Sequence, residues 1–534
     1  MAFTLLFLSP IASFAKGIDE TIDEWFTPIA NAWEALVFTP VPIGDLKVPF
    51  VVILLVGGAG FFTLYFGFIN IRKFPLSVNV VRGKYDDIDH ASEAVQSESV
   101  NVIDGDVVDT IRVEGKEGEV SHFQALATAV SGTVGLGNIA GVAVAIAVGG
   151  PGATFWMIIC GLLGMSSKFV ECTLGVKYRD IDADGTVYGG PMYYLSKGLD
   201  ERGYTKIGKV LAIVFAIFCV GASFGGGNAF QSNQATVQLI SMLGLSGGAV
   251  KTVIGIILAV LVALVILGGI KSIAKVTGRI VPFMAAIYVA ACLFIIISNF
   301  GFVDDAFVMI FEGAFSPAAG FGGLMGVLIV GFQRAAFSNE AGAGSAAIAH
   351  SAVRTKFPAS EGIVALMEPF IDTVLICTMT ALVIIMFNSD GAFTYGNLDP
   401  NDNVILNATG ESLGGVDLTS MAFESVLPWF PYILTIAIIL FAFSTMISWS
   451  YYGLQSWKYL FGKGPKADMT FKVIFLLFIV IGAAAKLDAV IKFSDAMILA
   501  LVFPNMIGLF FLFPKVKEEL NKFLNAIRRD QMSD

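Results

Sequence analysis

Two short stretches of the chain place glycine beside polar side chains within otherwise apolar sequence. Residues 131–140 read SGTVGLGNIA and residues 338–347 read SNEAGAGSAA, with glycines at the fourth and sixth positions after each serine. In the first stretch the glycines would point to all sides of a helix instead of forming one packing stripe. The spacing therefore predicts that each helix breaks partway along its length.

A broken helix exposes backbone N–H groups at a positive dipole end and C=O groups at a negative one. These match the two ends of a zwitterion such as an amino acid. Thr133 and Glu340 hold equivalent positions in the two stretches, so we expect them to face each other across a binding site. Two alternatives stay open. Glu340 could be a hydrogen-bond anchor for the unwound backbone, and the Thr133 hydroxyl could bond to a carbonyl one turn back in its own helix.

The composition indicates that the elements holding these breaks lie in lipid. Only 14% of the 534 residues are charged, against about 25% in a soluble domain, while 56% are hydrophobic and the mean hydropathy is +0.78. Apolar runs of roughly 20 residues recur, which is the length needed to cross a bilayer as a helix. They lack the period-two alternation of barrel strands, so the chain is expected to be an all-α polytopic membrane protein.

The apolar runs predict about 11 transmembrane helices. They lie near residues 49–71, 123–148, 152–177, 208–243, 250–268, 280–299, 321–350, 360–387, 427–456, 470–485 and 488–513. Lys and Arg gather in alternate loops, and the longest loop of the other kind, 388–424, has neither. Because positive loops stay in the cytoplasm, this pattern places the N-terminus outside the cell (inner) membrane and the C-terminus in the cytoplasm.

Three segments outside these spans have a polar or mixed character. Residues 1–48 are expected to be extracytoplasmic, and residues 3–15 within them fit either a cleaved signal peptide or an interfacial anchor. Residues 72–122 are expected to form an acidic cytoplasmic loop. Residues 514–534 form the expected cytoplasmic tail, in which 515–530 has the pattern of an amphipathic helix at the inner membrane surface.

The loop charges give the two broken helices opposite orientations across the membrane. Paired breaks of this kind are typical of carriers built from inverted repeats, with a binding site near the middle of the bilayer. Residues 123–299 would form the first five-helix repeat and residues 300–513 the second, while the span at 49–71 stands outside both.

Other classes of function find little support. The net charge is −10, but the acidic side chains are spread over several loops, so a nucleic-acid partner is not predicted. The histidines are scattered and the cysteines lie in apolar segments without metal-ligand spacing, so neither an enzyme site nor an organic cofactor is expected. A channel would usually show a repeated filter segment. The cysteines are Cys160, Cys172, Cys219, Cys292 and Cys377.

Several further charges fall inside predicted spans. Glu368 and Asp372 are four residues apart on one helix face and could couple to ions or protons. Lys168 and Glu171 are expected to pair at the interface, with the lysine stem snorkelling to water. Arg334 is expected to balance Asp372 or the carboxylate of the second break.

Several motifs together resemble a known family. They are GTVGLGNIAG (132–141), GGPGATFWMIICGLLG (149–164), KYR (177–179), GGPMYYL (189–195), GGIKSI (268–273) and FSNEAGAGSA (337–346). Their order is similar to that of the alanine or glycine:cation symporters, the sodium:alanine symporter family of the amino acid carrier superfamily. Thr154 and Ile158 depart from the usual signature and lie outside the candidate site.

The resemblance implies a LeuT-type fold of two inverted five-helix repeats preceded by one extra helix. It also implies sodium-driven import of a small neutral amino acid, alanine or glycine, with proton coupling as the alternative and an ion channel as a weaker one. The partners are then the amino acid, Na⁺ as the co-transported ion, and the lipid bilayer. By motif, the substrate-binding residues would be Thr133, Gly137, Gln231, Phe337, Ser338 and Glu340. The sodium ligands would be Val130, Thr133, Ser444 and Thr445.

Each of these assignments has a structural alternative. Gln231 could form an amide bond between helices, and Phe337 could be a core aromatic rather than the wall of a binding site. The hydroxyls of Ser444 and Thr445 could bond to their own helix.

Overall fold

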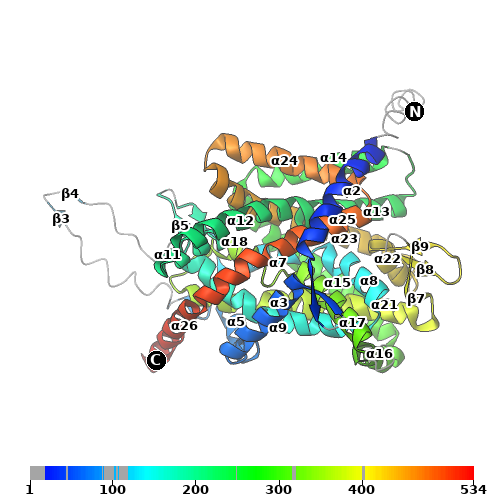
Figure 1. Ribbon diagram of the computed structural model, residues 1–534, viewed down its shortest axis with the longest axis horizontal. Helices are drawn as coiled ribbons and strands as arrows, with labels where there is room; N and C mark the ends of the chain where they lie inside the picture. Colours follow the sequence, from blue (N-terminus) through cyan, green and yellow to red (C-terminus); the bar gives the residue numbers. More distant parts are fainter. Residues whose placement is uncertain are drawn as a thin grey trace.

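The computed structural model describes residues 18–43, 46–86, 88, 102–103, 106–107, 118–183, 185–247, 249–315, 320–399 and 403–533. The expected signal or anchor segment at 3–15 and most of the acidic loop lie outside these ranges. The prediction of a helical protein is confirmed, because helices make up most of the described chain (Figure 1).

The first group of five predicted membrane helices opens with a broken helix. It consists of α7 (His122–Thr133), the short turn η1 (Leu136–Asn138) and α8 (Ala140–Gly149), with a bend of 55° between the two parts. There follow α9 (Gly152–Lys177), α12 (Thr205–Phe224) continuing through η3 (Gly225–Ala229) into α13 (Phe230–Leu243), α14 (Val250–Ile266) and α15 (Gly269–Ser298).

The second half repeats this order of elements. It opens with α17 (Gly320–Asn339) and α18 (Ala346–His350), separated by the second break. There follow α19 (Pro358–Val364), α20 (Met367–Pro369), η6 (Phe370–Cys377) and α21 (Thr378–Phe387), then α23 (Phe430–Phe461), α24 (Pro465–Ala484), α25 (Leu487–Ala500) and α26 (Val502–Ser533).

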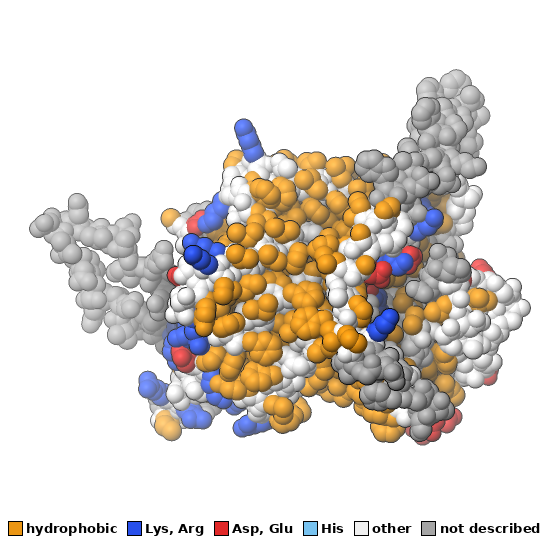
Figure 2. Space-filling view, viewed as in Figure 1, with side chains coloured by type: hydrophobic (Ala, Val, Ile, Leu, Met, Phe, Trp, Pro, Cys, Tyr) orange, Lys and Arg blue, Asp and Glu red, His pale blue; other side chains and the backbone are white. Residues whose placement is uncertain are grey.

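In the described residues, seven helices are long and apolar enough to cross a membrane, and the bent pair α7–α8 makes an eighth. Two shorter apolar helices, α14 and α3 (Phe50–Tyr65), have 17 and 16 residues. With the second broken helix, these elements overlap the eleven apolar runs of the sequence, and that all eleven cross the membrane stays a prediction. Figure 2 shows hydrophobic side chains covering the middle of one face, with Lys and Arg gathered toward the end where α26 finishes.

Smaller elements connect and flank the long helices. They are β1 (Pro40–Ile43), β2 (Leu46–Pro49), α4 (Ile69–Arg72), α5 (Phe74–Val81), β3 (Val102–Ile103), β4 (Asp106–Val107), β5 (Asp180–Ile181), β6 (Val187–Tyr188), α10 (Pro191–Tyr193), η2 (Tyr194–Gly198), α11 (Leu199–Glu201), η4 (Phe300–Phe302), α16 (Val303–Phe315) and η7 (Asn388–Asp390). The pairs β1–β2, β3–β4 and β5–β6 are antiparallel.

Local sequence explains where α7 begins and how the backbone turns at the second break. Ser121 and Gln124 form a capping box that starts α7, with Gln124 N 3.3 Å from Ser121 Oγ and Ser121 N 3.0 Å from Gln124 Oε1. In the second break Gly342 and Gly344 have φ of 94° and 86°, values that glycine adopts without steric cost. Glu340 has φ 53°, so a carboxylate residue itself takes the left-handed conformation that ends α17.

The N-terminal segment contains a helix that the sequence reading did not predict. Helix α2 (Ile18–Val37) lies across α25 (Figure 1). Its Phe26 ring is 5.0 Å from that of Phe493, and its Trp33 ring is 5.6 Å from that of Phe218. This part of the 1–48 segment therefore packs on the helical bundle.

The C-terminal tail differs from the expected separate surface helix. Helix α26 runs without interruption through Pro514 to Ser533. Its apolar positions Val516, Leu520, Phe523 and Ile527 are buried. The Phe523 ring lies 5.6 Å from that of Phe357, so the apolar stripe of the tail packs on protein. An amphipathic pattern alone does not tell a membrane surface from a protein surface.

The long loop at 388–424 is folded. It contains the antiparallel sheet β7 (Phe393–Leu398), β8 (Val404–Leu406) and β9 (Ser412–Leu413), followed by α22 (Val416–Glu424). The Thr419 hydroxyl on α22 donates to the Ile139 carbonyl at 3.3 Å, directly after the first break. The sheet and the end of α26 lie at opposite ends of the molecule (Figure 1). The loop thus covers the first break from the end opposite to α26.

Candidate functional site

The first break is held by amide side chains. Asn138 Oδ1 accepts from Gly135 N at 2.9 Å, and Gln231 Oε1 accepts from Leu136 N at 2.9 Å. The other end of Gln231 donates from Nε2 to the Gly226 carbonyl at 2.9 Å. Gln231 therefore joins α13 to the unwound backbone, which is the interhelical bond that the sequence left open, and it lies at the break as the motif implied.

The glycines of the first break allow other elements to approach the backbone closely. A Cβ on Gly135 would lie 2.5 Å from Thr445 Oγ1 and 3.0 Å from Gln231 Oε1. A Cβ on Gly137 would lie 3.4 Å from two ring atoms of Phe337. No side chain fits at Gly135, and Gly137 already lies in van der Waals contact with the aromatic ring.

Phe337 forms a wall beside the first break. Its ring packs edge-to-face on Phe230 at a centroid distance of 5.2 Å, and the Arg334 guanidinium lies 5.7 Å from the ring centroid. The opposite edge lies near η3, where a Cβ on Gly226 would be 3.1 Å from Phe337 Cε2. The side chain is fixed on several sides, so it limits the space beside Gly137.

The second break is tied to the first through a tryptophan that the sequence analysis did not single out. Trp449 Nε1 on α23 lies 3.1 Å from Glu340 Oε1 and 3.2 Å from the Gly132 carbonyl. The Ser345 hydroxyl donates to Glu340 Oε2. Glu340 is therefore anchored by Trp449 and Ser345, and one indole N–H bridges both broken helices.

The Thr133 hydroxyl bonds to backbone carbonyls of its own helix. Its hydroxyl lies 3.3 Å from the Ala129 carbonyl and 3.4 Å from the Val130 carbonyl, both in its own helix. This is the backbone bond that the sequence left open as the alternative to facing Glu340. Spacing identified equivalent positions in the two breaks, but the rotation of each helix decides where the side chains point.

A second bridge between the breaks runs through Asp372 on η6. Its Oδ1 accepts from Asn138 Nδ2 at 2.7 Å, and its Oδ2 accepts from Ser338 Oγ at 2.8 Å. The Thr373 hydroxyl adds a third donor at 2.7 Å. The buried carboxylate thus receives hydrogen bonds from both broken helices, beside the candidate substrate residue Ser338.

The proposed sodium ligands lie where α7 meets α23, but their contacts run through Ser131. The Thr445 hydroxyl donates to the Ser131 carbonyl at 3.0 Å, and the Ser131 hydroxyl donates to the Ser444 carbonyl at 2.8 Å. Ser444 Oγ bonds to its own helix at Phe441, 3.0 Å away, and the Val130 carbonyl accepts from Val134 N at 2.7 Å. Ser131 is a hydroxyl residue at the start of the first motif, and this signal could have identified it.

The buried charges form a chain that the sequence analysis did not anticipate. Lys168 Nζ lies 3.1 Å from Glu368 Oε1, and both side chains are fully buried. Glu368 Oε2 is 3.5 Å from His350 Nε2, and His350 Nδ1 is 2.5 Å from Glu361 Oε1. Glu361 Oε2 also contacts His122 Nδ1. This row of buried charged side chains joins α7, α18, α19, α20 and α9.

These contacts correct two expectations and leave a third untested. Lys168 does not snorkel to an interface, because burial inside the bundle gives it Glu368 as its partner. Arg334 pairs with Asp495 on α25 rather than with a carboxylate near the breaks. Glu368 on α20 pairs with Lys168, whereas Asp372 on η6 accepts from Ser338, and the coupling of either carboxylate to ions or protons stays a prediction.

The candidate substrate residues lie in the closed interior of the bundle. Thr133, Gln231, Phe337, Ser338 and Glu340 are at most 4% exposed. The breaks therefore supply a set of backbone and side-chain polar groups that is shut off from water, with Phe337 as its aromatic wall. A small molecule could reach these polar groups only after a movement of the surrounding elements.

Comparison with known proteins identifies the family of the chain. The family model described as the sodium:alanine symporter family matches residues 42–534. The sodium/alanine symporter AgcS of Methanococcus maripaludis is 39% identical over 484 residues, covering 90% of this chain and 96% of the relative. The amino-acid carrier protein AlsT of Bacillus subtilis is 35% identical over 404 residues, covering 75% of this chain and 73% of the relative.

A likeness to solved structures is more distant. The crystal structure of MhsT in complex with L-phenylalanine matches with a TM-score of 0.48 and 14% identity, covering 75% of this chain and 99% of that chain. The relatives in sequence are transporters, and the family model spans both broken helices and all of the buried bridges described above. The chain belongs to the sodium:alanine symporter family.

Proposed function

We propose that the protein is a sodium-coupled symporter that imports a small neutral amino acid, alanine or glycine, by alternating access around its two broken helices. The observation that carries this proposal is the double bridge between the breaks, through Trp449 to Glu340 and through Asp372 to Ser338. Both bridges involve carboxylates buried at the breaks, where a substrate ammonium or a cation would find a partner.

The wall at Phe337 supports a small substrate. The ring stands against Gly137 on one side and near Gly226 on the other, which leaves little room for a long side chain. The unwound backbone supplies N–H groups for a carboxylate, and Glu340 supplies a charge for an ammonium group. The six residues Thr133, Gly137, Gln231, Phe337, Ser338 and Glu340 remain the proposed substrate site.

The coupling ion is proposed to be Na⁺ between α7 and α23. Ser131, Ser444 and Thr445 bring hydroxyl and carbonyl oxygens together there, and Val130 and Thr133 lie on the adjoining turn. Hard oxygen ligands of this kind suit a small cation. Asp372 is the carboxylate through which proton coupling would act, because it lies at both breaks, whereas Glu368 is committed to Lys168.

Transport by purified protein in liposomes tests this function. Labelled alanine outside and an inward sodium gradient should give accumulation above equilibrium, and replacing sodium with potassium should abolish it. Accumulation driven by a proton gradient without sodium would favour the proton-coupled alternative. Equilibration that never exceeds the outside concentration, with single-channel currents, would favour a channel. Glycine competing with alanine would show whether both are substrates.

The membrane orientation is a separate proposal. The basic loops and the C-terminal part of α26, from residue 514 on, are placed in the cytoplasm, and the loop containing α22 outside the inner membrane. Single cysteines at the exposed positions Asp390 and Lys466 should react with an impermeant maleimide from the outside and the inside, respectively. The opposite labelling would overturn this orientation.

A further inference from the structure

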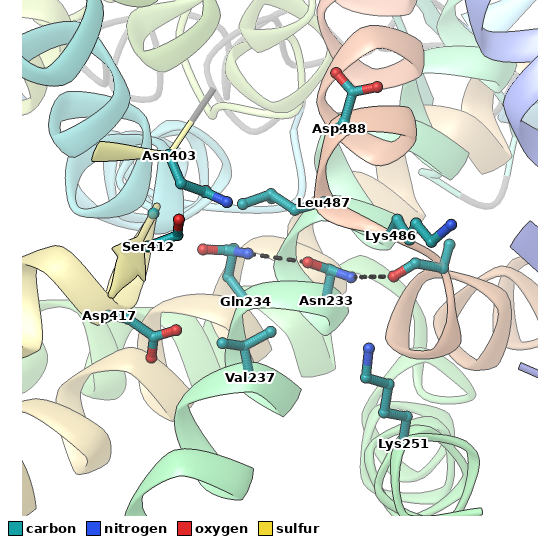
Figure 3. Close-up of a pocket in the computed structure, with 12 residues that line it drawn as sticks. Asn233, Gln234, Val237, Lys251, Asn403, Ser412, Asp417, Lys486, Leu487 and Asp488 are labelled. Atoms are coloured by element: carbon teal, nitrogen blue, oxygen red, sulfur yellow. Dashed lines mark hydrogen bonds between the residues drawn. The ribbon is translucent and has the colours of Figure 1, made fainter. Parts of the chain in front are cut away.

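A cavity of about 450 Å³ opens beside the folded loop that covers the first break. It lies between α13, the first turn of α14, the β9–α22 segment and the start of α25 (Figure 3). Val237 and Leu487 supply apolar surface, and the polar lining includes Asn233, Gln234, Lys251, Asn403, Asp417 and Asp488. The cavity is large enough for an amino acid and is separate from the closed site at the breaks.

Two opposite charges in this lining have no partner among the described residues. Asp488 Oδ2 is 2.9 Å from Lys492 Nζ, and Lys486 also has an interaction partner. By contrast, Asp417 Oδ1 is buried without a hydrogen bond, and the structure gives Lys251 no ion pair within the described chain. Burial raises the pKa of Asp417 to about 6. An unpaired buried carboxylate oxygen is costly unless a ligand satisfies it.

The geometry keeps these two charges apart. Figure 3 shows Asp417 and Lys251 on opposite sides of Val237, each directed toward the same space. The amides between them are fixed: Gln234 Nε2 donates to Asn233 Oδ1 at 2.9 Å, and Asn233 Nδ2 donates to the Ala485 carbonyl at 2.8 Å. The cavity therefore presents one anionic wall, one cationic wall and a rigid polar floor.

We propose that this cavity is a second binding site for a zwitterionic amino acid, with the ammonium group at Asp417 and the carboxylate at Lys251. The proposal rests on the proposed function for the choice of ligand. A single cation would satisfy only Asp417, and a single anion only Lys251. A small zwitterion satisfies both and leaves no net charge in the cavity.

The second site is connected to the breaks by direct hydrogen bonds. Gln234 Oε1 accepts from Val416 N at the start of α22 at 3.0 Å. Gln234 lies one turn along α13 from Gln231, which holds the first break. Thr419 on the same α22 bonds to Ile139. A ligand in the cavity thus contacts the two elements that cover and hold the first break, which suits a site that receives substrate before the bundle opens.

Equilibrium binding of labelled alanine to the full-length protein in lipid nanodiscs tests the site. The wild type should bind two molecules of alanine per chain. Asp417→Asn and Lys251→Met should each bind one, with unchanged melting temperature, while the control Asp390→Asn, an exposed residue of the same loop, should bind two. One molecule bound by wild type and variants alike, with normal sodium-driven transport, would overturn the second site and leave the proposed function intact.

Competition with singly charged probes separates the zwitterion from simpler ligands. In Glu340→Gln protein, in which the site at the breaks is weakened, alanine should bind the cavity at least tenfold more tightly than methylammonium or acetate. Equal competition by methylammonium would show a cation site at Asp417, and equal competition by acetate would show an anion site at Lys251. Either result would contradict the proposal. Absence of any alanine binding or transport in the wild type would instead overturn the proposed function.

The alanine affinity of the second site should decrease as the pH falls. Below pH 6 Asp417 takes up a proton and loses the charge that holds the ammonium group. Alanine affinity of the second site should therefore fall about tenfold between pH 7.5 and 5, since about one-tenth of a group with a pKa of about 6 is ionised at pH 5. Asp417→Asn, which should bind alanine only at the breaks, should show no such fall. The other charged groups facing this region are Lys251, Lys486, Asp488 and Glu411, and a fall that persists in Asp417→Asn would overturn the assignment.

Discussion

Trp449 Nε1 lies 3.1 Å from Glu340 Oε1, so a side chain from α23 holds the carboxylate of the second break. The same N–H is 3.2 Å from the Gly132 carbonyl of the first broken helix. The two breaks are far apart in sequence, and this donor joins them, as does the Asp372 carboxylate through Asn138 and Ser338. A movement that separates the two breaks must stretch or exchange this shared hydrogen bond.

Replacing Trp449 with phenylalanine should weaken alanine binding. The substitution keeps an aromatic ring but removes the donor to a charged acceptor, a bond with a net value of about 1.5–3 kcal/mol. We expect the apparent KM for alanine to rise at least tenfold in liposome uptake. Trp457→Phe on the same helix is the matched control, because Trp457 Nε1 has no hydrogen-bond partner among the described residues. An unchanged KM in Trp449→Phe would show that the bridge does not shape the substrate site.

Gly135→Ala should abolish most transport. The new Cβ would lie 2.5 Å from Thr445 Oγ1 and 3.0 Å from Gln231 Oε1, so the break must shift away from both α23 and α13. Gly141→Ala in α8 is the control, since its Cβ would meet no atom within 4 Å. The expected uptake rates are less than a tenth of wild type for the first and near wild type for the second. Normal uptake by both variants would mean that the close approach at Gly135 is not needed for function.

The single variant Lys168→Met should be less stable than the double variant that also carries Glu368→Gln. Removing one member of a fully buried ion pair leaves an uncompensated charge and costs about 3–5 kcal/mol. In Lys168→Met with Glu368→Gln the charge is gone from both sides, so part of the stability should return. Melting temperature of the detergent-solubilised protein reports the difference. A double variant less stable than Lys168→Met would contradict a simple ion pair between these residues.

Thr445→Val should separate sodium binding from alanine binding. The substitution keeps the side-chain shape and removes the hydroxyl that lies 3.0 Å from the Ser131 carbonyl. We expect the half-saturating sodium concentration to rise about tenfold, on the scale of one lost charge-assisted contact, with alanine affinity at saturating sodium little changed. Ser450→Ala is the control on the same helix, because its hydroxyl bonds to Ile447 within α23. Equal sodium dependence in both variants would remove Thr445 from the ion site.

The sequence was most informative about features that depend on local composition. Apolar run length predicted the membrane helices, and the glycine spacing predicted both breaks, because each follows from the residues of a single segment. The position of Gln231 at the first break came from motif resemblance and is matched by its bond to Leu136 N. The Thr133 hydroxyl turns back onto α7, which is the alternative that the sequence left open, and its contact with a substrate stays a prediction.

Contacts between distant segments were missed for a physical reason. Trp449 carries no local signal that distinguishes it from other tryptophans in apolar helices. The chain from His122 through Glu361 and His350 to Glu368 brings together side chains more than 200 residues apart in sequence, as the separation of 239 residues between His122 and Glu361 shows. Sequence separation of this size leaves no periodicity to detect, and the pairing depends on how the helices cross.

By itself, the sequence determined that this chain is a helical membrane protein with two broken helices of similar composition, since hydropathy and glycine spacing act within each segment. The tertiary structure alone decided which polar groups meet. It placed Trp449 and Asp372 between the breaks, paired Lys168 with Glu368, and left Asp417 and Lys251 facing one cavity. Buried charges must find partners within the packed bundle, and the packing of helices distant in sequence determines which partners they find.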